Sequence, residues 1–151
     1  MKKYTFILAA LALLAFVKPV SAQTAPATFT GAKAKLKHYD ALYIINSNDD
    51  KKIRSTLSNM NNALSDSRLK GKLHLELIAF GDGVAVYMKD SQYEPLLMSL
   101  QAKGVVFAQC NNTLNERKID RDQLFSFVFP VPSGNGEIIL RQYEGWAVVH
   151  P

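Results

Sequence analysis

The chain has 151 residues, of which 48% are hydrophobic and 21% are charged, so it is long enough to bury the core of one domain. Its 18 basic and 13 acidic side chains give a formal net charge of +5, but Lys2, Lys3 and Lys18 lie in an N-terminal segment that we expect to be removed. Taking those three from 18 leaves 15 basic against 13 acidic side chains, and this near balance argues against a nucleic-acid-binding protein.

Residues 1–22 have the layout of a secretory signal peptide. Two lysines precede an apolar run from Phe6 to Val17, and the segment ends in the small residues Val20-Ser21-Ala22. The run is about a dozen residues long, too short to span a bilayer comfortably, which disfavours a retained anchor. We therefore predict cleavage after Ala22 and a periplasmic or secreted protein with no membrane association after cleavage.

Residues 23–38 are small, polar and aperiodic, and they predict a flexible leader ahead of one domain at 39–151. The domain opens with Ala41 to Ile45, a continuous apolar run typical of a strand covered on both faces. A helix follows, and Ser47 with Asp50 resembles a capping box at its start. Its inward face is marked at helical spacing by Ile53, Leu57, Met60 and Leu64.

The middle of the domain predicts a second strand and a second helix. Residues Leu73 to Phe80 have the pattern of a strand that becomes more buried toward its end. Gly81-Asp82-Gly83 then predicts a tight turn, followed by a short segment around Val84 to Met88. The next helix, in the stretch from Glu94 to Gly104, is expected to turn Leu96, Leu97 and Leu100 inward and to stop at Gly104.

The last third repeats the alternation of strand and helix. A third strand is expected from Val105 to about Gln109, then a short helical segment over residues 111–119. A fourth strand precedes Pro130 and Pro132, which we expect to end it. A final helix in residues 136–145, closed by Gly145, leads to a short strand from Trp146 to Val149.

This alternation predicts an α/β fold: a three-layer α/β/α sandwich around a mainly parallel sheet. Ligands of such sheets bind beyond the carboxyl ends of the strands. The first three strands all end in polar or glycine-rich stretches, and as neighbours they would bring these ends together at one edge. The expected rim comprises Asn46, Ser47, Gly81, Asp82, Gly83, Cys110, Asn111 and Thr113.

Cys110 is the candidate for chemistry on this rim. It is the only cysteine, so it cannot form an internal disulfide. A thiol just before a helix N-terminus meets unpaired N–H groups and the positive end of the helix dipole, which favour the thiolate. The alternative is a small buried apolar residue at a strand end. An exposed sulfur would favour chemistry, and a buried one would favour the structural role.

Other signals for chemistry are weaker. The Gly-Asp-Gly stretch lacks the spacing of a phosphate-binding loop, and Asp82 is a possible base but more typical of an exposed turn. His38, His74 and His150 are scattered along the chain without the spacing of known ligand pairs, so we expect no metal site and no cofactor. The absence of a Cys-x-x-Cys motif argues against peptide-thiol oxidoreduction.

Four stretches together resemble the DsrE/DsrF-like (DsrEFH) family, and within it the exported single-domain members. They are YIINSNDDKKIRSTLSNMNNAL, KGKLHLELIAFGDGV, LQAKGVVFAQCNNTL and RQYEGWAVVHP, and they occur in that order over most of Leu42 to Pro151. The resemblance implies a three-layer sandwich, assembled as homotrimers or hexamers. The best understood members of the family are subunits of sulfur-relay complexes, in which a cysteine carries sulfur as a persulfide.

The resemblance therefore implies that Cys110 takes part in sulfur or thiol-redox chemistry with a partner thiol protein. In that hypothesis the thiolate accepts sulfane sulfur, Asn111 and Thr113 shape the helix end, and Gly81 to Gly83 line the pocket. The alternative hypothesis is a non-catalytic module that binds a small ligand or assembles into oligomers, with Cys110 as a packing residue.

Overall fold

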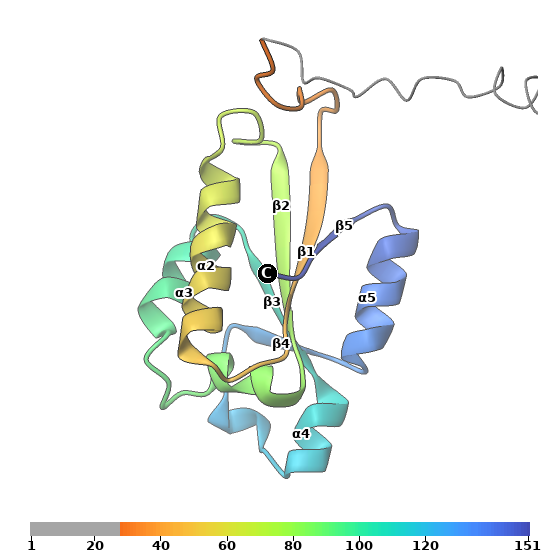
Figure 1. Cartoon of the computed structure of the whole chain (residues 1–151). Helices are drawn as coiled ribbons and strands as arrows, with labels where there is room; N and C mark the ends of the chain where they lie inside the picture. Colours follow the sequence, from red (N-terminus) through yellow and green to blue (C-terminus); the bar gives the residue numbers. More distant parts are fainter. Residues whose placement is uncertain (1–27) are drawn as a thin grey trace, which may run out of the picture. The chain divides into compact units, whose positions relative to one another are not determined.

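The computed structural model describes residues 28–151 (Figure 1). The expected signal peptide and residues 23–27 of the leader lie outside these residues. The chain divides into two units at residue 32, and the unit Lys33–Pro151 contains every described helix and strand. Among the described residues, no helix has the length and apolar character needed to cross a bilayer.

Five strands form one sheet in the order β4-β3-β2-β1-β5, and every pairing is parallel. The strands are β1 (Tyr39–Ile45), β2 (Leu73–Ala79), β3 (Val106–Cys110), β4 (Val128–Val131) and β5 (Ala147–Val149). The α-helices are α2 (Asp50–Ser65), α3 (Glu94–Gln101), α4 (Asn111–Arg117) and α5 (Gly134–Tyr143). Two 3-10 helices complete the elements of the described residues: η2 (Gly81–Tyr87) and η3 (Arg121–Gln123). The predicted α/β class and parallel sheet are confirmed.

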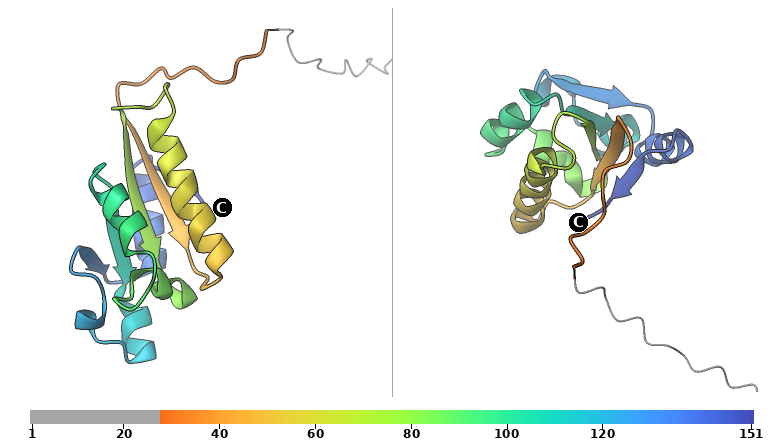
Figure 2. Two further views of the ribbon diagram at one scale, coloured as in Figure 1. Left: turned by 90° about the vertical axis from the view of Figure 1, so that its left-hand side faces the viewer. Right: turned by 90° about the horizontal axis from the view of Figure 1, so that it is seen from above.

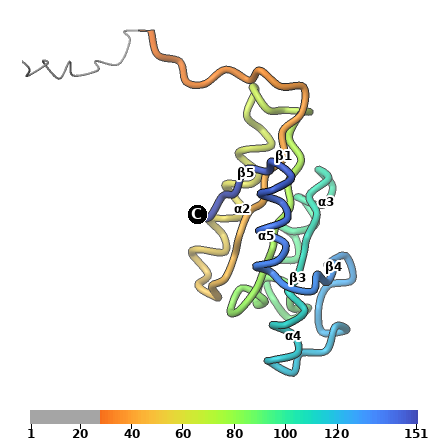
Figure 3. Tube along the Cα trace, turned by 90° about the vertical axis from the view of Figure 1, so that its right-hand side faces the viewer, coloured from red at the N-terminus to blue at the C-terminus, as the bar shows by residue number. Residues whose placement is uncertain are grey.

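Helices cover both faces of the sheet, which gives the three predicted layers. Helices α2 and α3 lie against one face (Figure 2, left), and α5 lies against the other (Figure 3). The α2/α3 face carries the larger core, in which Tyr43 and Phe107 of the sheet pack with Leu57 and Leu97 of the helices. The α5 face has a smaller core of Leu42, Ile44, Ile78 and Ala108, with Ile138 and Trp146 packed against it.

The chain runs across the sheet in one direction from β1 to β4 and then returns. Helix α5 carries it back over the opposite face, so that β5 pairs with the outer side of β1. A single helix thus covers the α5 face, and apolar side chains near β4 stay exposed there: Val106 is 46% and Phe129 is 58% exposed.

Four local predictions were wrong. The cap of α2 is Asp49, whose side chain accepts a hydrogen bond from the Lys52 N–H at 2.8 Å, because the helix begins at Asp50 and Ser47 lies too far upstream. Ser47 instead accepts a bond from the Asp49 N–H at 3.2 Å. Leu96 is 39% exposed, because the buried side of α3 is defined by Leu97 and Leu100, three residues apart.

The other two corrections concern a turn and a proline. The predicted Gly-Asp-Gly turn is the first part of the 3-10 helix η2, which continues through Tyr87. Pro130 does not end the fourth strand but lies within β4, opposite Gln109. A proline is tolerated there because β4 is an edge strand, and one side of it has no ladder to hydrogen-bond.

Candidate functional site

Cys110 is the last residue of β3 and the N-cap of α4. Its backbone is still extended, with φ −63° and ψ 117°, so the chain turns directly from strand to helix at the thiol. The residue is 6% exposed. The predicted strand-to-helix junction is therefore present, and Cys110 lies just below the molecular surface.

The chain leaves the neighbouring strands β3 and β4 toward opposite faces of the sheet. Leu114 of α4 packs into the core on the α2/α3 face, whereas Ile138 of α5 packs into the core on the α5 face. Such a divergence opens a crevice at the carboxyl ends of the two strands, where open α/β sheets bind ligands. Cys110 lies at this position.

N–H and O–H groups at the starts of two helices influence the pKa of the Cys110 thiol. Burial by itself raises the pKa of the thiol, but donors around the sulfur lower it by more, and the net pKa lies below the usual value. The donors are the backbone N–H and the hydroxyl of Thr113, the N–H of Gly134 at the start of α5, and the N–H of Asn112. Donors of this kind stabilise a thiolate more than a thiol.

A surface pocket of about 260 Å³ borders the sulfur. Besides Cys110 its lining comes from the end of β2, from α4 and from the start of α5: Phe80, Gly81, Asn112, Thr113, Glu116, Ser133, Gly134 and Asn135. Gly134 suits this arrangement, because a Cβ there would lie 3.0 to 3.2 Å from the Phe80 ring and Cβ, so that the Phe80 side chain would have to shift. Glycine thus allows the α5 N-terminus to approach the thiol.

Three of the predicted rim residues meet at this pocket: Gly81, Cys110 and Thr113. The Gly81 N–H donates to Thr113 Oγ1 at 3.0 Å, which joins the end of β2 to α4. The Thr113 hydroxyl therefore accepts a bond from Gly81, and it is also among the groups that lower the pKa of the Cys110 thiol.

The other five predicted residues do not line the pocket. Asp82 forms an ion pair with Arg117 at 2.6 Å, and Asn111 is exposed at the first position of α4. Gly83 is buried, and a Cβ there would overlap the Ile45 carbonyl oxygen. Asn46 and Ser47 follow β1, which is separated from β3 by β2, so the site lies at the ends of β2, β3 and β4 and does not reach β1.

Sequence reasoning missed the loop between β4 and α5. Ser133 caps α5 by accepting a hydrogen bond from the Gly136 N–H at 3.3 Å, and the Gly134 N–H helps to lower the pKa of the Cys110 thiol. The signal was present in Pro132-Ser133-Gly134-Asn135-Gly136-Glu137, a helix-capping serine within a glycine-rich turn after a strand. What could not be read from this motif was its pairing with Cys110.

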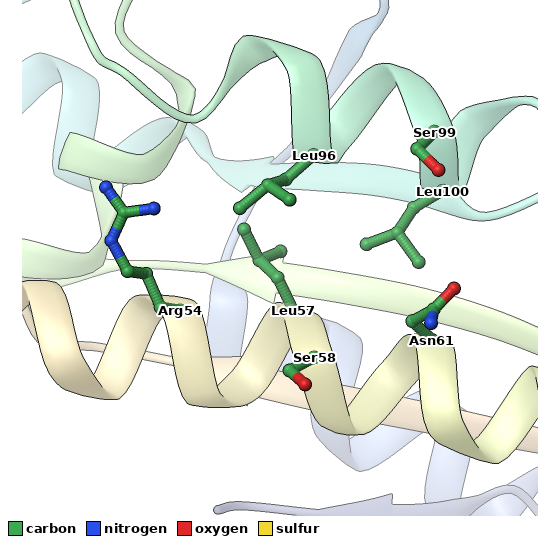
Figure 4. Close-up of a pocket in the computed structure, with 7 residues that line it drawn as sticks. All are labelled: Arg54, Leu57, Ser58, Asn61, Leu96, Ser99 and Leu100. Carbon is green, nitrogen blue, oxygen red and sulfur yellow. The ribbon is translucent and has the colours of Figure 1, made fainter.

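A second hollow, of about 360 Å³, lies between α2 and α3 (Figure 4). Leu57 and Leu96 point toward each other across it, and serines and Asn61 border it. Its one charged lining residue, Arg54, is held by Asp50 at 3.0 Å. This hollow has no cysteine, histidine or carboxylate among its lining residues to act as, or to activate, a nucleophile, so the Cys110 pocket is the better candidate for chemistry.

Two of the histidines that are scattered along the sequence lie together in the structure. The rings of His38 and His74 lie with their centroids 4.2 Å apart, because β1 pairs with β2 in a register that places Asp40 opposite His74. No sequence spacing reveals this, since 36 positions separate the two histidines and only strand pairing unites them.

Comparison with known proteins gives one family and one fold. The family model described as "DsrE/DsrF-like family" matches residues 22–151. A solved structure of a protein of unknown function, MTH1491 from Methanobacterium thermoautotrophicum, is 34% identical, with a TM-score of 0.71, over 75% of this chain and 99% of that one.

Two further structures are similar in fold alone. YchN of E. coli is 16% identical, with a TM-score of 0.55, over 77% of this chain and 100% of that one. BT1422 of Bacteroides thetaiotaomicron, a conserved protein of unknown function, is 10% identical, with a TM-score of 0.59, over 74% and 94% of the two chains. No curated protein matches the chain.

Proposed function

The chain belongs to the DsrE/DsrF-like family, and from this membership we propose that it is an exported sulfur carrier or thiol-redox protein that uses Cys110 as its nucleophile. The observation that carries the proposal is the position of Cys110 at the β3–α4 junction, in a pocket that the start of α5 also lines; N–H groups from the starts of α4 and α5 and the Thr113 hydroxyl act on the thiol there. These groups lower the pKa of the thiol and so raise the fraction of thiolate at neutral pH.

The proposed step is transfer of a sulfane sulfur. The Cys110 thiolate attacks the outer sulfur of a donor persulfide, R–S–SH; a new S–S bond forms at Cys110 as the donor S–S bond breaks. The donor leaves as the thiolate R–S⁻, and Cys110 holds the sulfur as Cys–S–SH. A partner thiolate then attacks the outer sulfur and restores the Cys110 thiolate, so the cycle needs no other oxidant or reductant.

The pocket residues have separate tasks in this proposal. Thr113 and the N–H groups of Asn112 and Gly134 stabilise the thiolate before attack and when Cys110 is the leaving group. Gly81 holds the Thr113 hydroxyl in position. The absence of a second cysteine in the sequence means that the acceptor thiol belongs to another molecule.

The burial of Cys110 favours a second candidate, a small-ligand-binding or assembly module in which the thiol is structural. Cys110 is 6% exposed as a residue, which is typical of a core residue. In that case the pocket of about 260 Å³ binds a small polar or anionic ligand through the same N–H groups, with no covalent step.

Export and assembly complete the proposal. Export to the periplasm or outside the cell rests on the signal-peptide layout of residues 1–22. Homotrimers or hexamers follow from the family resemblance and are supported by exposed apolar side chains on the α5 side of the sheet. These are Val106, Phe129, Ile139, Leu140 and Tyr143.

The decisive experiment combines thiol reactivity with intact mass. The rate of alkylation by iodoacetamide should be measured from about pH 5 to 10, and we expect its midpoint to lie below that of a free cysteine, about 8.5. After exposure to a low-molecular-weight persulfide and removal of excess donor, the protein should gain the mass of one sulfur atom. A thiol acceptor should then remove that mass.

Cys110→Ala is the matched control, since it removes the only thiol and must abolish both signals. A folded protein whose Cys110 stays unreactive below pH 9 and never retains sulfur would overturn the carrier proposal. Unchanged ligand binding and oligomeric state in Cys110→Ala would then favour the module.

A further inference from the structure

A cluster of two histidines and one aspartate lies at the opposite edge of the sheet from Cys110. Asp40 is in β1, His74 is its partner residue in β2, and His38 precedes β1 by one residue. Asp40 Oδ1 is 2.7 Å from His38 Nε2 and 3.6 Å from His74 Nδ1. One ligand atom from each of the three residues can be chosen so that all lie within 4.8 Å of one another.

We propose that His38, Asp40 and His74 form a binding site for a divalent late first-row transition metal ion, with Zn²⁺ as the reference ion. Imidazole nitrogen and carboxylate oxygen are the ligands that such ions accept, and two histidines with one carboxylate is a recurrent set. With bonds of about 2.0–2.2 Å, tetrahedral ligand atoms lie about 3.3 to 3.6 Å apart. The 3.6 Å between Asp40 Oδ1 and His74 Nδ1 lies at the upper end of this range, whereas the 2.7 Å to His38 Nε2 is a hydrogen bond that an ion would replace by moving the exposed His38 ring.

The backbone holds the three residues in place before any ion arrives. The parallel register fixes Asp40 beside His74, and alternation along the extended chain puts His38 on the same face as Asp40. The side chains of His38 and His74 are 48% and 70% exposed, so each ring can rotate by the small amount that coordination needs. Asp40, at 25%, is the more firmly held ligand.

The surroundings make this an open site with moderate affinity. Three protein ligands leave a coordination position for water or an external ligand, as in zinc sites that are not purely structural. A hollow of about 550 Å³ beside His74 gives access to it. Lys70 and Lys103 line that hollow, and their positive charge weakens cation binding.

This site is independent of the sulfur proposal. It lies at the amino ends of β1 and β2, whereas Cys110 ends β3 at the carboxyl edge of the same parallel sheet. The thiol therefore has no part in it. Replacing Cys110 should leave the site intact, and a failure of either proposal does not affect the other.

The test is calorimetric titration of Zn²⁺ into the full-length protein produced without a histidine tag, in a Cys110→Ser background that excludes thiolate binding. We expect one ion per chain and a rise in melting temperature with Zn²⁺. His38→Ala and His74→Ala should each weaken binding at least about tenfold, and the double variant should abolish it. Replacement of Zn²⁺ by Co²⁺ should give visible d–d bands that are lost in the same variants.

His150→Ala is the matched control, because it removes the third histidine of the chain, which is exposed and outside the cluster. It should bind Zn²⁺ like the parent. No saturable binding by the parent, or equal loss in His150→Ala and His74→Ala, would overturn the site. Circular dichroism of each variant separates loss of ligands from loss of fold.

Discussion

Arg141 of α5 forms an ion pair with the buried Glu76 in β2 and donates a hydrogen bond to it from Nε. Nε and Nη2 of Arg141 lie 2.9 and 2.8 Å from Glu76 Oε2, while Glu76 is 1% exposed. The guanidinium also lies 4.2 Å from the centre of the Trp146 ring. This pair ties the one helix of the α5 face to the centre of the sheet.

Removal of the arginine should be costly because it leaves a carboxylate buried without its cation. We expect Arg141→Met, which keeps much of the side-chain length, to lower the free energy of unfolding by about 3 kcal/mol. The double variant Glu76→Gln/Arg141→Met should recover a large part of that loss. Urea denaturation followed by circular dichroism measures both, and equal stability of the single and double variants would contradict the assignment.

Glu76 should also make stability depend on pH. Burial raises its pKa, and although Arg141 lowers it, the net pKa lies above the ordinary 4.5. At a pH between 4.5 and the raised pKa, Glu76 keeps its proton in the folded chain but has lost it in the unfolded chain. The free energy of unfolding therefore falls as the pH rises through this window. Compared with Glu76→Gln, the parent should therefore lose stability across this window just above pH 4.5, as measured by denaturation at closely spaced pH values. A difference that does not vary with pH would exclude the effect.

Thr113 should tune the reactivity of Cys110. Thr113→Val removes the hydroxyl that donates to the sulfur and accepts from the Gly81 N–H, so the pKa of the thiol should rise and alkylation at neutral pH should slow. Loss of these bonds should also destabilise the fold by about 1 kcal/mol. Thr113→Ser keeps the hydroxyl and should retain the parental pH profile. Identical profiles for the valine and serine variants would contradict this role.

Gly83 should tolerate no side chain although it lies outside the pocket. Its missing Cβ is what allows η2 to pack on the Ile45 carbonyl, and we expect Gly83→Ala to destabilise the protein by about 1–3 kcal/mol. Gly136→Ala is the matched control: its Cβ would have only ordinary contact, 3.4 Å from the Ser133 Cβ, and it lies in a helix, where alanine is preferred. Thermal unfolding of the two variants should differ clearly, and comparable melting temperatures would refute the packing argument.

The exposed apolar side chains of the α5 side should govern self-association. Phe129 is 58% exposed on the edge strand β4, and we expect Phe129→Lys to shift the protein from oligomer to monomer in light scattering coupled to size exclusion. Leu96→Lys places the same charge at an exposed leucine of α3, on the other face of the sheet, and should leave the mass unchanged. If both variants keep the parental mass, β4 is not part of an interface.

Local patterns in the sequence predicted most of the fold. Apolar runs and helical spacing located the five strands and the main helices, because the pattern of each element is contained in a short stretch of sequence. The alternation of strands and helices then predicted the parallel sheet. Errors fell where packing decides between similar local options. Pro130 lies inside β4 only because that strand is at the edge, and Leu96 is exposed only because Leu97 and Leu100 define the buried side of α3.

The candidate sites divide in the same way. The sequence by itself determined that Cys110 follows a buried strand and precedes a helix, since both elements are local and adjacent to it. Only the tertiary structure decided that the α5 N-terminus, at Gly134, approaches the same sulfur, and that His74 lies beside Asp40. Both of these contacts depend on strand order and register. Strand order and register are set by the packing of the whole sheet, and no single stretch of residues determines them.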